Sequence, residues 1–171
     1  MAAQLIILRG NSGSGKTSTA KLLQENLGEG TILISQDVVR RQMLRTKDTV
    51  GSLSTSLLEN LVDFGMQNCK YIILEGILTN NKHGDMLRRI YTRYHPDVLV
   101  YYFEISFEET LRRHQFKDVS FGENEMRKWY LDSDVIGVDQ EHIIHDDLCQ
   151  EDILNKINDD IHKKGNDFLK Y

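Results

Sequence analysis

The chain has 171 residues, of which 40% are hydrophobic and 27% are charged, and its net charge at pH 7 is −5. This composition excludes a disordered chain and is typical of a soluble globular domain. The acidic balance also argues against a general nucleic-acid binder, because such proteins usually carry a basic surface.

We expect one domain over residues 1–171, because this length suits a single hydrophobic core and no proline-, glycine- or serine-rich linker divides it. The longest apolar runs have only the length of a strand, so neither a signal peptide nor a membrane span is expected. Cys69 and Cys149 fit no metal-ligand spacing and are expected to be buried thiols in a reducing cytosol. The expected location is therefore cytoplasmic.

Strand-like and helix-like patterns alternate along the chain. Runs of apolar and β-branched residues predict strands at 5–9, 31–35, 71–74, 98–103 and 142–145. Apolar residues at helical spacing predict helices at 16–26, 38–44, 53–67 and 86–94, and one around 153–161. A capping box at 106–109 opens a further helix, and another contains Trp129, which we expect in the core. This alternation predicts an α/β fold with helices on both faces of a mostly parallel sheet.

A glycine-rich turn follows the first predicted strand and matches the phosphate-binding pattern GxxxxGK[ST]. Its glycines allow a tight turn that exposes backbone N–H groups to phosphate oxygens, and the positive end of the next helix adds to the attraction. Lys16 is expected to reach the β- and γ-phosphates of ATP, and Thr17 to ligate Mg²⁺. The expected nucleotide contacts are Gly10, Asn11, Ser12, Gly13, Ser14, Gly15, Lys16 and Thr17.

Two acidic residues follow predicted strands, at the sheet edge where open α/β proteins bind ligands. Asp37 is a candidate base for an alcohol that attacks the γ-phosphate, and the alternative is a helix N-cap. Glu75 closes a buried strand and is a candidate ligand for Mg²⁺ or for the acceptor, the alternative being a structural carboxylate. Arg40 and Arg41 follow Asp37, and one of them is expected to contact the acceptor.

Residues at about 112–130 are typical of a lid, in which two helices flank a polar segment and bring arginines onto the transferring phosphate. Arg113 and Arg127 are the preferred catalytic pair in this segment. The alternative is two solvated helix faces. A GTPase is excluded because the base-reading pattern [NT]KxD is absent, and residues 155–158 carry Asn where Asp is required.

The whole chain resembles the small P-loop kinases in its GxxxxGKT loop, its acid after the second strand, its Glu-Gly at 75–76 and its Leu-Arg-Arg at 111–113. Residues 72–77 are similar to uridine kinases. Residues 34–37 with their trailing arginines resemble chloramphenicol phosphotransferase, zeta-type toxins and the 5′-hydroxyl polynucleotide kinases. The resemblance implies a P-loop fold with a five-stranded parallel sheet of order 2-3-1-4-5, and it implies the roles given above for Lys16, Thr17, Asp37 and the lid arginines.

These observations together predict an ATP- and Mg²⁺-dependent kinase that phosphorylates a hydroxyl of a small molecule. One alternative is a kinase of polynucleotide 5′-hydroxyl ends, and another is a nucleotide-switched regulatory protein with little transferase activity. The arginine-rich lid and the acid at position 37 favour transfer over switching. The acidic balance favours a small acceptor over nucleic acid.

Overall fold

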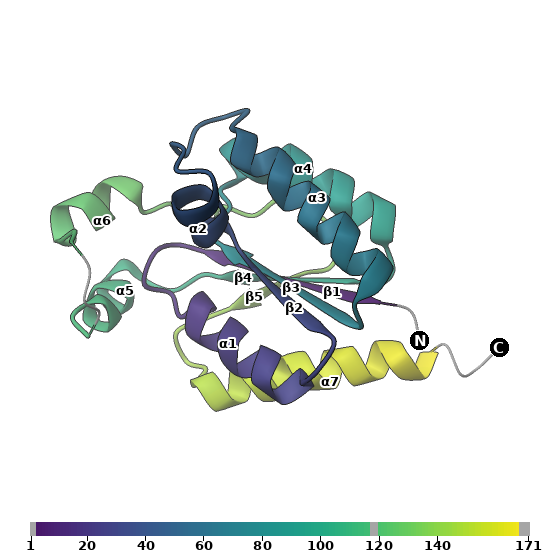
Figure 1. The fold of residues 1–171 in the computed structure, drawn as a ribbon. Helices are drawn as coiled ribbons and strands as arrows, with labels where there is room; N and C mark the ends of the chain where they lie inside the picture. The colour runs from purple at the N-terminus through teal and green to yellow at the C-terminus, as the bar shows by residue number, and fades with distance from the viewer. Residues whose placement is uncertain (1–2, 117–119, 168–171) are drawn as a thin grey trace.

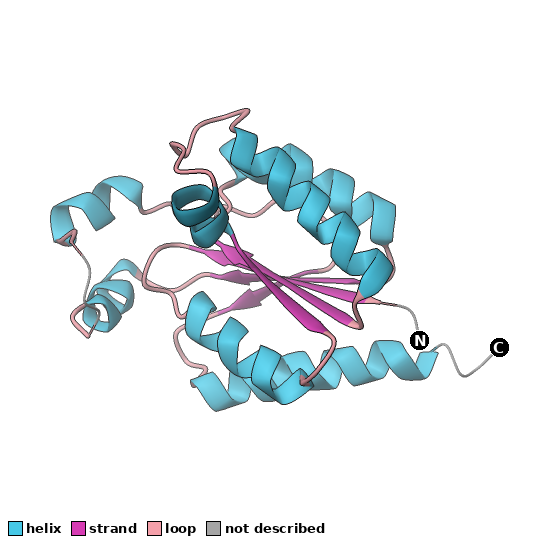
Figure 2. Ribbon diagram, viewed as in Figure 1, coloured by secondary structure: helices cyan, strands magenta, loops and turns pink. Residues whose placement is uncertain are grey.

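The computed structural model describes residues 3–116 and 120–167. Its described strands form a five-stranded sheet in which each neighbouring pair is parallel, in the order β2-β3-β1-β4-β5 (Figure 2). The strands are β1 (Gln4–Gly10), β2 (Thr31–Ser35), β3 (Tyr71–Gly76), β4 (Val98–Phe103) and β5 (Glu141–Ile144). The predicted α/β class and strand order are confirmed.

Helices cover both faces of the sheet (Figure 1). On one face lie α3 (Leu53–Asn68) and α4 (Asn80–Tyr94), and on the other lie α1 (Lys16–Leu27) and α7 (Gln150–Asp167). Three short helices stand beyond the carboxyl ends of the strands: α2 (Gln36–Val38), α5 (Phe107–His114) and α6 (Glu123–Trp129). Within the described part of the chain, none of the helices combines the length and the apolar character needed to cross a membrane.

The central strand β1 joins the two halves of the core. Successive side chains of a strand point to opposite faces, so Leu5 and Ile7 pack on the α3–α4 side while Ile6 and Leu8 pack on the α1–α7 side. All four side chains are fully buried. The loop that follows β1 therefore starts from a strand that is buried along its whole length.

Two helices differ from their predicted form. α4 begins at Asn80 rather than at 86, because His83 and Gly84 in its first turns are buried although their residue types look polar or helix-breaking. The segment predicted as a regular helix at 38–44 is α2 followed by a π-helix, η1 (Val39–Met43), in which the Leu44 N–H donates to the Val39 carbonyl. The local sequence carries no signal for this inserted residue.

Two expected core residues lie outside the core. Trp129 is 48% exposed on α6, because α6 stands away from the sheet and packs an aromatic edge only against Phe121 among the described rings. Cys149 is exposed just before α7, and Cys69 is half-buried. The prediction of two buried thiols is therefore wrong.

Candidate active site

The glycine-rich loop connects β1 to α1 and is pressed against two other elements. Gly10 and Gly13 have positive φ angles of 148° and 79°. A Cβ atom at Gly10 would lie 2.7 Å from the Phe103 carbonyl oxygen, and one at Gly13 would lie 2.8 Å from the Thr110 carbonyl oxygen. Only glycine fits at either position, so the loop backbone is held at the end of β4 and against α5.

Lys16 lies over this loop at the start of α1 and is almost fully buried. Its Nζ donates to the Asn11 carbonyl at 2.7 Å and lies 3.3 Å from the Ser14 Oγ. The ammonium group and the N-terminus of α1 thus direct positive charge at the same place, as an anion site requires. This geometry suits the phosphate contact that we predict for Lys16.

The next residue of α1 meets β3. Thr17 Oγ1 donates to Glu75 Oε2 at 3.1 Å, and Glu75 is only 3% exposed. A hydroxyl beside a carboxylate is an oxygen donor set of the kind that Mg²⁺ prefers, with water and phosphate oxygens as its remaining ligands. No group of three or more His, Cys, Asp or Glu side chains with metal-binding geometry occurs among the described residues. The two side chains therefore fit a metal that is shared with a nucleotide.

Asp37 lies in the first turn of α2, and Ser35 occupies the N-cap position. Ser35 is also the sheet partner of Glu75, so Asp37 lies just beyond the carboxyl end of β2, next to the end of β3 that carries Glu75. The Asp37 side chain is 60% exposed, and its Oδ1 accepts bonds from Arg40 Nη2 at 2.9 Å and Arg41 Nε at 2.7 Å. Both arginines are turned onto this carboxylate, and their contact with an acceptor stays a prediction.

Of the two predicted lid arginines, Arg113 reaches the phosphate loop. Its Nη1 donates to the Ser14 carbonyl at 2.8 Å, while its Nε donates to Glu109. Hydrogen bonds from Arg112 and Arg113 lower the pKa of Glu109 to about 2. Ser106 caps α5 as predicted, but the Glu109 side chain holds the arginines instead of closing the capping box. Glu109 thus fixes Arg113 over the loop.

Arg127 does not reach the loop. It bonds to Glu123 within α6 at 2.9 Å, lies 4.3 Å over the centre of the Phe107 ring, and is 64% exposed. It lines an open hollow of about 370 Å³ at the junction of α5 and α6, together with Tyr130. A catalytic role for Arg127 would require α6 to move, and it stays a prediction. The segment 117–119 of the predicted lid lies outside the described residues.

A polar cluster that the sequence analysis missed lies at the same edge. The Asp48 carboxylate accepts from Lys82 Nζ at 2.7 Å and from Gln36 Nε2 at 3.4 Å, and His83 Nε2 lies 3.7 Å away. His83 is 1% exposed, and burial lowers its pKa below the ordinary value. The Gln36 Cβ packs so closely on Gly76 that a Cβ there would lie 2.6 Å away. The cluster thus adjoins the Thr17–Glu75 pair.

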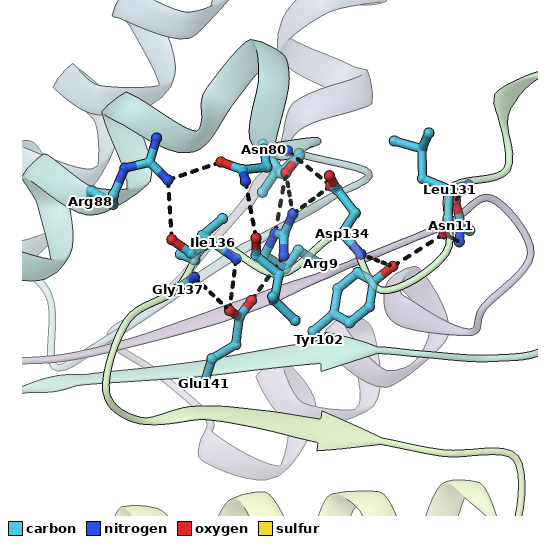
Figure 3. A network of polar contacts seen from close by, with 12 residues as sticks. Arg9, Asn11, Asn80, Arg88, Tyr102, Leu131, Asp134, Ile136, Gly137 and Glu141 are labelled. Carbon is cyan, nitrogen blue, oxygen red and sulfur yellow. Dashed lines mark hydrogen bonds and ion pairs between the residues drawn. The ribbon is translucent and has the colours of Figure 1, made fainter.

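Arg9, the residue just before the loop, is a fully buried cation that the sequence analysis also missed (Figure 3). Its guanidinium donates to Asp134 Oδ2 and Glu141 Oε1, each at 2.8 Å, and to the Leu78 carbonyl. The group also lies 4.9 Å over the centre of the Tyr102 ring. The two ion pairs fasten the base of the loop to residues 125 and 132 positions later in the chain.

Comparison with known proteins places this site in a family. The profile described as "AAA domain" matches residues 5–126, which is more than half of the chain. The chain belongs to the AAA-domain family. No curated protein sequence matches this AAA-domain chain.

Solved structures share its fold. The Mycobacterium tuberculosis APS kinase CysC, in complex with AMPPNP and APS, has 17% identity and a TM-score of 0.67, and the match covers 92% of this chain and 96% of that one. A gluconokinase from Sinorhizobium meliloti has 13% identity and a TM-score of 0.66, with 98% of each chain covered. The Deinococcus radiodurans tunicamycin resistance protein has 14% identity and a TM-score of 0.66, covering 93% and 95%. At these identities the likeness shows the P-loop kinase fold.

Proposed function

We propose that this AAA-domain chain is a kinase that transfers the γ-phosphate of ATP to a hydroxyl of a small molecule, with Mg²⁺ as cofactor. The observation that carries the proposal is the contact between Thr17 and Glu75, 3.1 Å apart, directly beside a lysine-bearing phosphate loop. A switch protein also needs the loop and an acid that holds the metal, whereas a transferase needs in addition an acid where the acceptor meets the phosphate. Asp37, exposed at the same end of the sheet as Glu75, supplies that second acid.

The nucleotide side of the reaction uses the loop and its flanking residues. The loop backbone and Lys16 hold the β- and γ-phosphates, and Thr17 and Glu75 hold Mg²⁺, which when bound neutralises charge on these phosphates. Arg113, fixed by Glu109 over Ser14, adds positive charge close to the transferring group. Each residue thus acts on charge that grows as the phosphoryl group moves.

The acceptor side uses Asp37. The acceptor oxygen forms a bond to the γ-phosphorus while the bond from that phosphorus to the bridging oxygen breaks, so that ADP leaves. The hydroxyl proton passes to the Asp37 carboxylate, which is exposed at the same sheet edge as Glu75. The cluster of Asp48, Lys82 and Gln36 supports a polar acceptor, because its groups donate and accept hydrogen bonds beside this edge. Two similar structures are an APS kinase and a gluconokinase, which also supports transfer.

The test is to incubate the protein with ATP and Mg²⁺ across a panel of sugars, nucleosides, antibiotics and DNA or RNA oligonucleotides. ADP release that depends on a small hydroxyl compound is the expected result, and the matched Lys16→Met variant should show none. Transfer of labelled phosphate to oligonucleotide 5′ ends would instead establish the polynucleotide kinase. Release that never exceeds the acceptor-free rate for any compound would favour the nucleotide switch.

A further inference from the structure

Helices α5 and α6 form an arm that projects beyond the sheet edge, and its return end is fastened to the phosphate loop (Figure 1). The Asn11 side chain makes two hydrogen bonds with the backbone of one residue, Leu131 (Figure 3). Its Nδ2 donates to the Leu131 carbonyl at 2.7 Å, and its Oδ1 accepts from the Leu131 N–H at 2.9 Å. Asn11 is almost fully buried. Two opposed bonds to one residue fix both its position and its rotation.

The chain just after Leu131 is held on the sheet by independent contacts. The Tyr102 hydroxyl lies 3.4 Å from the Leu131 carbonyl and accepts from the Asp134 N–H at 3.2 Å. Asp134 in turn accepts from Arg9 and from the Asn80 N–H, at 2.8 and 2.9 Å. Leu131 is therefore the point at which the arm leaves a firmly anchored segment (Figure 3).

The first helix of the arm, α5, touches the same loop. Arg113 of α5 donates to the Ser14 carbonyl, and the Tyr130 hydroxyl donates to the Ile105 carbonyl at 2.9 Å, which joins the return end of the arm to the chain just before its entry. The phosphate loop thus contacts the arm at two places, the last turn of α5 and the return end at Leu131. Its residues Ser14 and Asn11 are the two attachment points.

Asn11 is also in contact with the phosphate-binding lysine, since Lys16 Nζ donates to its carbonyl oxygen at 2.7 Å. We propose that Asn11 is a positioning residue, whose side chain sets the arm relative to the phosphates and transmits the seating of a nucleotide at Lys16 to Leu131. The kinetic part of this inference rests on the proposed kinase function. The Leu131 backbone engages both polar atoms of the Asn11 side chain, so the proposal assigns this side chain to the arm and not to the phosphates.

Trp129 is the single tryptophan of the chain and lies on α6, so its fluorescence reports on the arm. The experiment compares wild type with Asn11→Ala and Tyr102→Phe, of which the second loosens Leu131 without touching the loop. The matched control is Asn68→Ala, an exposed asparagine on α3 that bonds only to Phe64 among the described residues. Three quantities are measured: the Kd for AMPPNP with Mg²⁺ by calorimetry, the Trp129 fluorescence change at saturation, and acceptor-dependent kcat. Thermal unfolding checks that each variant is folded.

Wild type and Asn68→Ala should show the same Trp129 change on saturation. Asn11→Ala and Tyr102→Phe should lose most of that change and at least about tenfold in kcat, because a small misplacement of catalytic groups is costly. Their Kd for AMPPNP should stay within about threefold of wild type, since the contacts that hold the nucleotide in the ground state are retained. An unchanged Kd for AMPPNP together with a lost change in Trp129 fluorescence is the result that a merely structural role would not give.

Three results would overturn the inference. One is an Asn11→Ala variant whose Kd rises more than about tenfold while the Trp129 change at saturation is intact, because Asn11 would then be a direct nucleotide contact. Another is a Tyr102→Phe variant with wild-type fluorescence and kcat. The third is a wild type that binds AMPPNP with no Trp129 change. Binding and fluorescence need no phosphoryl transfer, so a failure of the kinase proposal alone would leave both readouts standing.

Discussion

Thr17 donates a hydrogen bond to Glu75 at 3.1 Å, although the two residues are 58 positions apart in the chain. The contact joins the first turn of α1 to the end of β3, so the phosphate loop and the acidic strand end form one site. If this pair holds Mg²⁺, Glu75→Gln should weaken the apparent affinity for Mg²⁺ by about 10–100-fold, because the amide keeps the shape but not the charge. Activity measured against Mg²⁺ concentration checks this, and an unchanged Mg²⁺ dependence would assign Glu75 to the acceptor or to the fold.

Asp37→Asn separates a proton acceptor from a structural residue. The amide can no longer accept a proton as a carboxylate does, so kcat should fall on the order of 10²–10⁴-fold while ATP affinity stays nearly constant. Because Ser35 occupies the N-cap, Asp37→Ala should lose similar activity with little change in thermal stability. Steady-state kinetics and thermal unfolding of both variants test this. A near-normal rate in Asp37→Asn would move the search for the base to Glu75.

The two arginines of the arm should behave differently when tested in parallel. Arg113→Ala removes a guanidinium fixed at 2.8 Å from the Ser14 carbonyl, so we expect a loss of about 10²–10³-fold in kcat and a smaller change in ATP affinity. Arg127→Ala should have the same kind of effect only if α6 closes onto the phosphate. Single-turnover rates and equilibrium binding separate the two contributions. If ATP affinity and kcat fall equally in Arg113→Ala, the residue contacts the nucleotide in the ground state.

Arg9→Met should destabilise the protein by about 3–5 kcal/mol, because it leaves two largely buried carboxylates without their cation. The double variant Arg9→Met with Glu141→Gln should recover part of this loss, since one uncompensated charge is removed. Arg89→Met is the control, because Arg89 pairs with Glu59 at the surface and should change stability by no more than about 1 kcal/mol. Urea unfolding measures all three. Equal effects of Arg9→Met and Arg89→Met would contradict a structural role for the buried network.

The pH dependence of stability should contain a contribution from His83. Burial lowers the pKa of His83 in the folded protein; Asp48 opposes the shift, and Lys82 and Arg9 add to it. Below about pH 6.5 the unfolded chain therefore binds a proton at His83 that the folded chain does not bind. Stability is lost as the pH falls toward the lower pKa that His83 has in the folded protein. The change in unfolding free energy between about pH 7.5 and about pH 5.5 should be smaller in His83→Gln than in wild type. An equal change in His83→Gln and in wild type would contradict this contribution.

Much of the fold follows from local patterns, whereas the contacts of the site do not. Continuous apolar runs identify β1 and β4, and the glycine-rich pattern predicts a turn between a strand and a helix. The partners of the loop could not be predicted, because Leu131 is 120 positions from Asn11 and Asp134 is 125 positions from Arg9. Arg9 also looks like an ordinary polar end of a strand. Only the folded chain shows that its charge is enclosed by two carboxylates.

The π-helix η1 has one consequence for how the site tolerates change in length. A π-turn amounts to a single extra residue in a helix, and one residue corresponds to a rotation of about 100° around the helix axis. Removing a residue from a regular helix would therefore rotate everything that follows, whereas the wide turn of η1 takes up its extra residue before Leu44. Deleting Gln42 would let η1 close as a regular helix and keep the loop that carries Asp48 close to Lys82 and Gln36, which lie 2.7 and 3.4 Å from its carboxylate. The chain between Asp37 and the polar cluster can thus lose one residue at η1, but not in a regular helix, without dismantling the cluster.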